Sequence, residues 1–555
     1  MLNSFIANYR FYLYVKSRLR VYAISKFPTM NSSSRMFPQF QQTNKTTYTY
    51  NTMIRSHLWN SNSIPQVAFE IYVKMKREGI DCDNYTYPFV LKACTMICGL
   101  WEGRQVQAEV VKVGFFDSNV FVINGLIGMY CKCRQMSCSR VLFDGFHGKD
   151  LVSWNLMLSG YAGCGDMAEA RKVFDEMPER DVVSWSIMID GYGKKIGDVS
   201  RARSLFDQMH KRDLVSWNTM IDSYAKVGDM VAARELFDEM EHKNVISWNI
   251  MIDGYSQHRD PKEALNVFNL MLSNDIKPDK FCVVGAISAC GQLGALDQGR
   301  WIHIYIRKNK ITLDNVVNTA LVDMYMKCGS TEEARAVFVS MSERNVISWN
   351  VMISGLGING FGDEALSYFD QMGKEGIQVD NLFYVSVLTV CSHAGFISEG
   401  LEIFRKIPKP KVEHYGCLID LLGRAGKLGQ ALSFIASMPM EPNSDLWGSV
   451  LLACQVQKNV GLGEFVLNKL KKLDGDDCGV YVVMSNIYAD NGMWECVTKM
   501  RKMVSEKGMR KESGKSVIEV VDGGVKEFVC GKKGRVHSDE IEQVLWSLSK
   551  IMDLE

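Results

Sequence analysis

The chain has 555 residues and a mass of 62.8 kDa, several times the size of a typical domain, so a single hydrophobic core is not expected. Hydrophobic residues make up 47% of the chain and charged residues 23%, a balance that excludes wholesale disorder. No apolar run of about 18 residues occurs, so no membrane insertion is predicted. The formal net charge of +1 excludes a nucleic-acid binder that works through bulk charge alone.

The first part of the chain is basic. Residues 1–40 contain six Lys or Arg residues, and the first acidic residue of the whole chain is Glu70. A basic leader with Ser and aromatic residues is typical of an organelle transit peptide, mitochondrial in preference to chloroplast. We therefore expect a transit peptide over 1–40 and a linker over 41–46. The alternative is a basic arm that stays attached.

A repeated string dominates the middle of the chain. Val or Ile, then Ser and Trp recur, with the tryptophans at Trp154, Trp185, Trp217, Trp248 and Trp349. From Trp154 to Tyr161 the apolar residues follow the spacing i, i+3, i+4, i+7, and those from Ala170 to Met177 repeat it. Gly165-Asp166 between the two stripes predicts a turn and a new helix start. One such hairpin cannot bury both stripes, so the sequence predicts an all-α, right-handed superhelical α-solenoid of helix–turn–helix repeats.

These units resemble plant pentatricopeptide repeats, in the subclass whose motifs alternate in length. Further strings carry the resemblance: "FVLKAC", "ISACGQLGALDQGRWIH", "CSHAGFISEGLEIF" and "VEHYGCLIDLLGRAGKLGQA". The resemblance implies about twelve repeats over residues 47–443. Their expected bounds are 47–83, 84–119, 120–150, 151–181, 182–213, 214–244, 245–279, 280–314, 315–345, 346–380, 381–411 and 412–443.

The C-terminal part resembles the extensions of this subclass. Residues 444–511, with "LWGSVLLAC" and "YVVMSNIYADNGMWE", are similar to the E extension, which has two degenerate helical repeats. Residues 512–555 are similar to a short E-plus tail. This tail departs from the family pattern, because Ser513-Gly514 stands where Pro-Gly is expected and Val517 where Trp is usual. The departure puts efficient recruitment of a partner through the tail in doubt.

The resemblance implies that single-stranded RNA is read along the first helices, one base per repeat. In the family the fifth and last residues of a motif specify the base, and an apolar second residue sandwiches it. On this sequence the base-specifying pairs are Asn51/Asp83, Asn124/Asp150, Asn155/Asp181, Ser186/Asp213, Asn218/Asn244, Asn249/Asp279, Thr319/Asn345 and Asn350/Asp380. The base-sandwiching residues are Val152, Val183, Val215, Ile246 and Ile347. The tryptophans are expected to be core residues.

The family pattern also implies base identities. Asn with Asp implies uracil, Ser186/Asp213 guanine, Thr319/Asn345 adenine and Asn218/Asn244 a pyrimidine. Amides, hydroxyls and carboxylates present different donor and acceptor sets, so such a scheme is chemically reasonable. Read with the N-terminus toward the 5′ end, the implied target is U-n-U-U-G-Y-U-n-A-U.

Catalytic motifs are absent from the sequence. Related proteins continue into a cytidine-deaminase-like domain, which needs His-x-Glu and Cys-x-x-Cys to hold zinc, and neither pattern occurs here. Phosphate-binding glycine loops are also missing, and the sixteen cysteines lack the spacing of zinc or disulfide frameworks. We predict no catalytic residue, no metal site and no cofactor.

The sequence therefore favours a sequence-specific RNA-binding adaptor in a plant organelle, acting in C-to-U RNA editing. It would recruit a deaminase-bearing repeat protein and editing accessory factors through the E region. One alternative is a factor for RNA stability, cleavage or splicing without editing. Another is a protein-binding helical scaffold, against which the Asn/Asp pairs at matched positions argue.

Overall fold

The computed structural model describes residues 46–59, 64–114, 119–377, 379–473 and 478–506, and the backbone of two strands at 515–519 and 525–529. The predicted transit peptide, nearly all of the predicted linker and most of the predicted tail lie outside these residues. Among the described helices, none combines the length and the hydropathy that crossing a bilayer requires.

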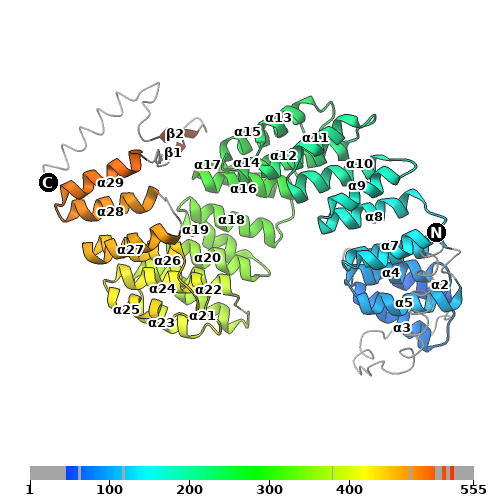
Figure 1. Cartoon of the computed structure of the whole chain (residues 1–555), viewed down its shortest axis with the longest axis horizontal. Coiled ribbons are helices and arrows are strands. Elements are labelled where there is room, and N and C mark those ends of the chain that lie inside the picture. Colours follow the sequence, from blue (N-terminus) through cyan, green and yellow to red (C-terminus); the bar gives the residue numbers. More distant parts are fainter. Residues whose placement is uncertain are drawn as a thin grey trace. The chain divides into compact units, whose positions relative to one another are not determined.

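The first compact unit extends to Gly254 and consists of paired helices (Figure 1). Each hairpin has a first and a second helix. The helices are α2 (Thr47–Trp59), α3 (Pro65–Arg77), α4 (Thr86–Met96), α5 (Leu100–Val113), α6 (Val120–Lys132), α7 (Met136–Gly145), α8 (Leu151–Cys164), α9 (Met167–Glu176), α10 (Val182–Asp190), the π-helix η2 (Gly191–Ile196), α11 (Val199–Gln208), α12 (Leu214–Val227), α13 (Met230–Glu239) and the start of α14 (Val245–Gln257).

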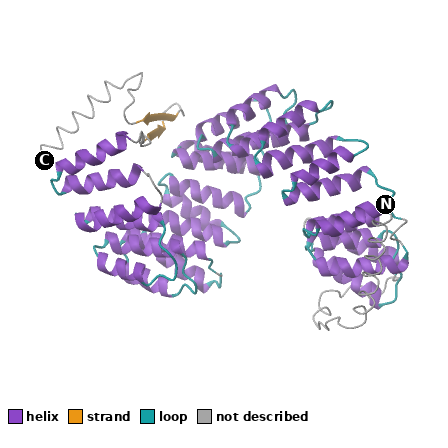
Figure 2. Cartoon of the chain, viewed as in Figure 1, coloured by secondary structure: helices purple, strands orange, loops and turns teal. Residues whose placement is uncertain are grey.

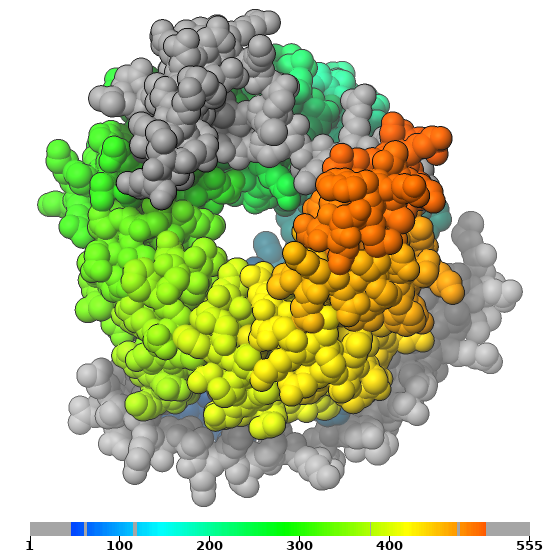
Figure 3. Space-filling view, turned by 90° about the vertical axis from the view of Figure 1, so that its left-hand side faces the viewer, coloured from blue at the N-terminus to red at the C-terminus, as the bar shows by residue number. Residues whose placement is uncertain are grey.

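The second compact unit begins at Tyr255 and continues the same alternation. Its yellow-green to orange helices follow one another along an arc in Figure 3. They are α15 (Pro261–Ser273), α16 (Lys280–Leu293), α17 (Leu296–Lys308), α18 (Asn315–Lys327), α19 (Thr331–Ser340), α20 (Val346–Ile358), α21 (Gly362–Lys374), α22 (Asn381–Ala394), α23 (Ile397–Arg405), α24 (Val412–Arg424), α25 (Leu428–Ala436), α26 (Ser444–Val456), α27 (Val460–Leu473), α28 (Cys478–Asp490) and α29 (Trp494–Glu506).

Within each unit the first helices of successive hairpins pack against one another. Contacts join α4 to α6 and α6 to α8 in the first unit, and α20 to α22 and α22 to α24 in the second. Second helices pack against their own first helix and against the first helix of the next hairpin, as α11 does on α10 and α12 and as α21 does on α20 and α22. The α-solenoid prediction is confirmed, because every hairpin buries its apolar stripes against its neighbours. The predicted right-handed twist of the whole array stays a prediction.

Aromatic side chains form the core between neighbouring hairpins. The ring centroids of Phe143 and Trp154 lie 4.8 Å apart in an edge-to-face arrangement, and those of Phe338 and Trp349 lie 5.0 Å apart. The same contact joins Phe174 to Trp185, Phe206 to Trp217 and Phe237 to Trp248. Each tryptophan packs on the second helix of the preceding hairpin. Trp248 and Trp349 are buried, as predicted for core residues, whereas Trp154, Trp185 and Trp217 are only half-buried.

One hairpin contains an extra residue. Trp185 and Trp217 are 32 residues apart, whereas the neighbouring tryptophans are 31 apart. The extra residue is taken up by η2, where the end of the first helix widens into a π-helix. Lys194 in η2 lies 2.7 Å from Asp190 and 2.6 Å from Asp222 on α12, so the widened turn is bound to the next hairpin.

Two strands distinguish the tail from the repeats (Figure 2). β1 (Lys515–Glu519) pairs antiparallel with β2 (Val525–Val529), with Val517 opposite Glu527. The sequence of the strands is rich in Val and Ile, and Asp522-Gly523-Gly524 between them is a composition that favours a hairpin. The all-α prediction therefore holds for the helical repeats and misses this hairpin.

Candidate nucleic-acid interface

The second residue of many repeats is apolar and exposed. The predicted base-sandwiching residues Val152, Val183, Val215, Ile246 and Ile347 expose between 54% and 64% of their surface. They stand in the first turn of a first helix, next to a Ser that is completely buried. A regular row of β-branched side chains costs free energy when it is exposed to water. The row is therefore suited to contact with flat apolar rings.

The row is longer than the sequence analysis proposed. The equivalent positions of other repeats carry Tyr48, Tyr85, Phe121, Phe281, Val316 and Leu382, which are exposed by 55% or more. These residues were missed because the search followed the Val-x-Ser-Trp string. The signal that finds them is their place as the second residue of each expected repeat.

Four predicted pairs are joined by a side-chain hydrogen bond. The amide nitrogens of Asn51 and Asn124 each donate to the carboxylate of their partner, Asp83 and Asp150, over 3.0 Å. The amide of Asn155 donates to Asp181 over 3.2 Å, and that of Asn218 to Asn244 Oδ1 over 3.3 Å. Three of these fifth residues, Asn51, Asn124 and Asn218, are also buried.

The last residue of a repeat has a second task that the sequence analysis missed: it caps the next first helix. Asp150 Oδ1 accepts the backbone N–H of Ser153 over 2.8 Å, and Asp181 Oδ1 accepts that of Ser184 over 2.8 Å. Asn345 accepts that of Ser348 in the same way. The signal in the sequence is Asp or Asn followed three residues later by Ser, which is typical of a helix N-cap.

Capping and pairing together determine the ionisation of these carboxylates. Burial alone raises the pKa of Asp83, but hydrogen bonds from the Thr86 N–H, the Asn51 amide and the Thr86 hydroxyl outweigh it, and the pKa falls below the usual value. Burial is outweighed in the same way at Asp150 and Asp181 by the capped Ser N–H and the paired Asn amide. Each carboxylate is therefore held ionised as an acceptor.

Three predicted pairs are not joined by a hydrogen bond among the described residues. In these pairs the Ser186 Oγ and Asn350 Oδ1 atoms are buried without a partner in the described chain, and Thr319 Oγ1 donates to the carbonyl of Asn315 over 2.6 Å. Their partners Asp213, Asp380 and Asn345 each cap a helix. The remaining pair has Asn249 in the first unit and Asp279 in the second, and Asp279 caps α16.

A cavity of about 380 Å³ in the first unit lies beside Ser186 and Asp213, a predicted pair that no hydrogen bond joins. Its lining includes Val183, Ser186, Asp190, Lys195, Asp213 and Val215. The two valines belong to successive repeats, and the buried Ser186 hydroxyl lies in the same lining as the Asp213 carboxylate. The cavity thus combines apolar side walls with free hydrogen-bonding groups, as recognition of a flat polar ring requires.

The described part of the chain also carries cysteines and other residue types that can bind metals. No group of three or more His, Cys, Asp or Glu side chains there is arranged to hold a metal ion. The thiols of the buried Cys94, Cys391 and Cys454 have pKa values raised by burial, to about 12, 12 and 11. They are small core residues rather than nucleophiles.

Family models match most of the helical part of the chain. The PPR repeat model matches residues 152–182, 183–214, 215–245, 319–346, 347–377, 383–409 and 413–441, and the PPR repeat family model matches 45–96 and 243–292. A pentatricopeptide repeat-containing protein of Arabidopsis thaliana is 45% identical over 534 residues, which are 95% of this chain and 88% of the relative. The chain belongs to the pentatricopeptide repeat family.

Other pentatricopeptide repeat proteins of Arabidopsis thaliana are also similar to it. One is 37% identical over 92% of this chain and 73% of its own length. Another, whose name includes the word mitochondrial, is 36% identical over 94% of this chain and 69% of its own length. The E motif model matches residues 457–519, which include α27 to α29 and β1.

Solved structures of a pentatricopeptide repeat protein share the fold. Maize PPR10 covers 84% of this chain and 75% of its own, with a TM-score of 0.52 at 18% identity. The same protein in complex with an 18-nt psaJ RNA element gives a TM-score of 0.54 at 17% identity over the same shares. At this identity the likeness supports the fold alone.

Proposed function

We propose that this pentatricopeptide repeat protein binds single-stranded RNA in a sequence-specific way, and that the pairs Asn51/Asp83 to Asn350/Asp380 select the bases. One repeated combination carries the proposal. An exposed apolar second residue occurs together with a helix-capping carboxylate or amide that lies beside the fifth residue. The RNA-bound structure of maize PPR10, a protein of the same fold, supports it.

A mechanism of base selection follows from this geometry. Each last residue is fixed by capping, so its oxygen keeps one position while a base enters between two apolar second residues. In the pairs Asn51/Asp83, Asn124/Asp150 and Asn155/Asp181 one amide hydrogen already bonds the carboxylate, so that bond fixes the orientation of the amide. In the Ser186/Asp213 pair both groups stay available to the base. Binding then replaces water with a preorganised set of donors and acceptors.

We further propose that the protein is a site-recognition adaptor for C-to-U RNA editing in an organelle, a mitochondrion in preference to a chloroplast. The match of the E motif model to residues 457–519 supports an editing role, and the relative named mitochondrial supports the compartment. The chain itself would supply no catalytic residue, metal or cofactor. A deaminase-bearing repeat protein and accessory factors would join through the E region.

The binding test uses the full chain and U-n-U-U-G-Y-U-n-A-U RNA against a scrambled RNA of equal composition, over a salt series. We expect tighter binding of the first RNA at every salt concentration, because base contacts do not depend on counterion release. Equal and steeply salt-dependent binding of both RNAs contradicts base reading. No binding of either RNA favours the protein scaffold.

A genetic test addresses the editing role. Loss of the protein should leave one organelle cytidine unedited, a few nucleotides past a match to the target. A transcript that is cut, spliced or degraded abnormally, with all cytidines edited normally, would instead assign the protein to RNA processing.

A further inference from the structure

Seven second helices in the described part of the chain end without a left-handed residue, and five of them, α7, α9, α11, α13 and α19, continue into extended backbone. After α11 the chain continues through Met209 at φ −70° and ψ 121°, which is extended backbone, and enters α12 at Leu214. An ending of this kind forms no 6→1 backbone bond of the type that usually satisfies the last carbonyl groups of a helix. Those carbonyls therefore need another donor.

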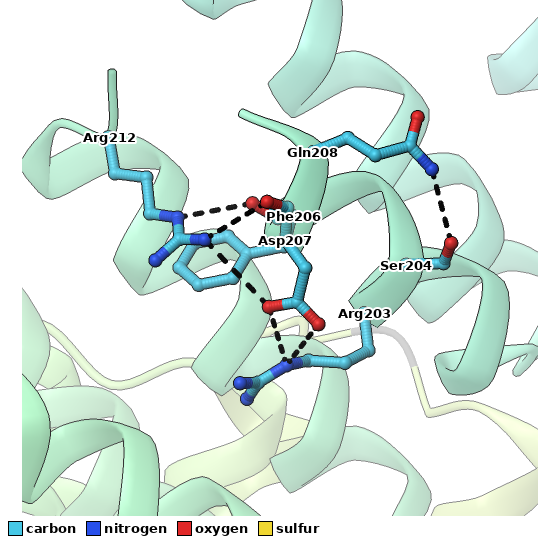
Figure 4. Close-up of polar contacts among 6 residues, drawn as sticks. All are labelled: Arg203, Ser204, Phe206, Asp207, Gln208 and Arg212. Carbon is cyan, nitrogen blue, oxygen red and sulfur yellow. Dashed lines mark hydrogen bonds and ion pairs between the residues drawn. The ribbon is translucent and has the colours of Figure 1, made fainter. Parts of the chain in front are cut away.

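A basic side chain supplies that donor (Figure 4). Arg212 Nε donates to the carbonyl of Phe206 over 3.1 Å, and its Nη2 donates to the carbonyl of Asp207 over 3.3 Å. The guanidinium carbon lies 4.5 Å from the centre of the Phe206 ring, and Nη2 lies 3.8 Å from the Asp207 carboxylate. The side chain thus ties the connecting loop to the end of α11.

Two more repeats have the same arrangement and a further two have a related one with lysine, and we name the five residues Lys149, Arg180, Arg212, Lys243 and Arg344 the clamp residues. Arg180 donates to the carbonyls of Phe174 and Asp175 over 2.9 and 3.0 Å, and Arg344 repeats this at its own helix end. Lys149 and Lys243 each donate to one carbonyl, that of the residue directly after the helix, Phe146 over 2.6 Å and Met240 over 2.7 Å. Each cation also lies over a Phe ring of the same second helix, at 4.5 to 5.2 Å.

The position of the clamp residues in the repeat is the decisive observation. Each directly precedes the last residue of its repeat, which is in turn Asp150, Asp181, Asp213, Asn244 or Asn345. That last residue caps the next first helix on its other side. The last residue is therefore fixed from both directions: the clamp ties the chain directly before it to the preceding helix, and its own side chain binds the next first helix.

We propose that the clamp residues are positioning residues for base selection, which fix the oxygen of the following Asp or Asn where a base is read. This inference rests on the proposed function. Their charge has an obvious second use, contact with RNA phosphates. The structure disfavours that use, because the Arg212 guanidinium already contacts two carbonyls, a ring and a carboxylate of its own chain.

The test uses the full chain and four RNAs that differ only at the base expected to face repeat 182–213. Wild type should prefer guanine there. In Arg212→Ala we expect that preference to fall about 5- to 10-fold, because the substitution removes about one charged hydrogen bond that helps to position Asp213. Preferences at the other positions should not change. Arg212→Lys should keep the guanine preference within about twofold, because lysine serves as the clamp in two natural repeats.

A matched control lies on α11, one turn before Asp207. Arg203 pairs with Asp207 over 3.0 Å but donates to no carbonyl at the helix end among the described contacts (Figure 4). Arg203→Gln should leave the guanine preference within about twofold of wild type. An equal loss of preference in Arg203→Gln and Arg212→Ala would overturn the assignment.

The remaining outcomes separate the two proposals. A wild-type chain without any base preference overturns the proposed function and the clamp together. A selective wild type whose guanine preference survives Arg212→Ala, or whose affinity falls equally for all four RNAs, overturns the clamp alone. If Arg212→Ala does not fold, Arg344→Ala is measured at the base expected to face Thr319/Asn345, with the same criteria. An unchanged base preference there also overturns the clamp.

Discussion

Two kinds of ending can be compared among the described second helices, one closed by the backbone and one closed by a basic side chain. In long repeats such as 47–83 and 280–314 the second helix has 13 residues or more and is followed by a left-handed residue, Gly79 at φ 73° or Lys310 at φ 53°. There the backbone itself closes the end, since Ile80 N–H donates to the Met75 carbonyl over 3.2 Å. In the five clamped repeats the second helix has 10 residues, and a side chain closes the end.

Both endings must bring the last residue of the repeat to the start of the next first helix, and they do so by different means. Both kinds of ending deliver a last residue to the cap of the next first helix, and Asn51 pairs with Asp83 in a long repeat as Asn124 pairs with Asp150 in a short one. Long repeats use extra chain length and a special backbone angle. The five clamped repeats have shorter second helices, and in them one basic side chain closes the helix end instead.

The largest expected effect comes from the aromatic core that follows a clamped repeat. Trp349 is completely buried against Phe338, the last aromatic of a clamped second helix. Trp349→Ala should lower the free energy of unfolding by about 3–5 kcal/mol, measured by urea denaturation. Trp494→Ala is the control, because Trp494 is 66% exposed. A loss below about 1 kcal/mol in Trp349→Ala would refute the core assignment.

A smaller effect is expected at the last residue of a repeat, which caps the next first helix. Asp181→Ala removes the cap of α10 and the partner of Asn155, and should lower the free energy of unfolding by about 1–2 kcal/mol. It should also abolish base preference at repeat 151–181. Asp175→Ala removes only an exposed pair with Arg171 and should be nearly neutral in both measurements. Equal effects of the two changes would contradict the double role of Asp181.

The left-handed ending of long repeats predicts a gain in stability. Lys310 has φ 53°, a conformation that glycine adopts without the steric cost of a side chain. Lys310→Gly should therefore raise the free energy of unfolding by about 0.5–1 kcal/mol in urea denaturation. Met341→Gly, in the extended ending of a clamped repeat, should not raise it. A loss of stability in Lys310→Gly would show that its side chain matters more than its backbone angle.

The smallest effect at neutral pH is expected from neutralising the capping carboxylates. The pKa values of Asp83, Asp150 and Asp181 are lowered in the folded protein, so their stabilisation is present above the unfolded value of about 3.9 and is lost as pH falls through the folded values. The triple Asp→Asn variant keeps caps and should be less sensitive to acid below about pH 4. Urea denaturation from pH 7 to pH 3 measures this, and an identical acid dependence would contradict it.

Much of the fold follows from sequence patterns. The tryptophan string and the two apolar stripes predicted hairpins that stack, because neither stripe can be buried within one hairpin. The row of exposed second residues follows from the same register. The fifth and last residues that the sequence paired are joined by a hydrogen bond in four pairs, since both residues lie at fixed places relative to the helix ends.

Other features depend on geometry that spacing does not reveal. The extra residue between Trp185 and Trp217 could have lengthened a loop, and only the structure shows it inside a π-helix. The clamp was visible as Lys or Arg before the last residue, but its meaning depends on the angle at which the preceding helix ends. Ser186 and Asp213 line one cavity without a bond between them, because serine is too short to reach across.

The double duty of the last residue has a consequence for exchanging repeats between proteins. A graft cut at the repeat boundary, after Asp181 for example, keeps Asn155 with its partner but separates Asp181 from Ser184, whose N–H it caps. The incoming repeat must therefore offer a compatible third residue. Without it, the carboxylate of the transplanted repeat loses the backbone N–H that holds it in place. The exchangeable module of this array is one repeat together with the first turn of the next.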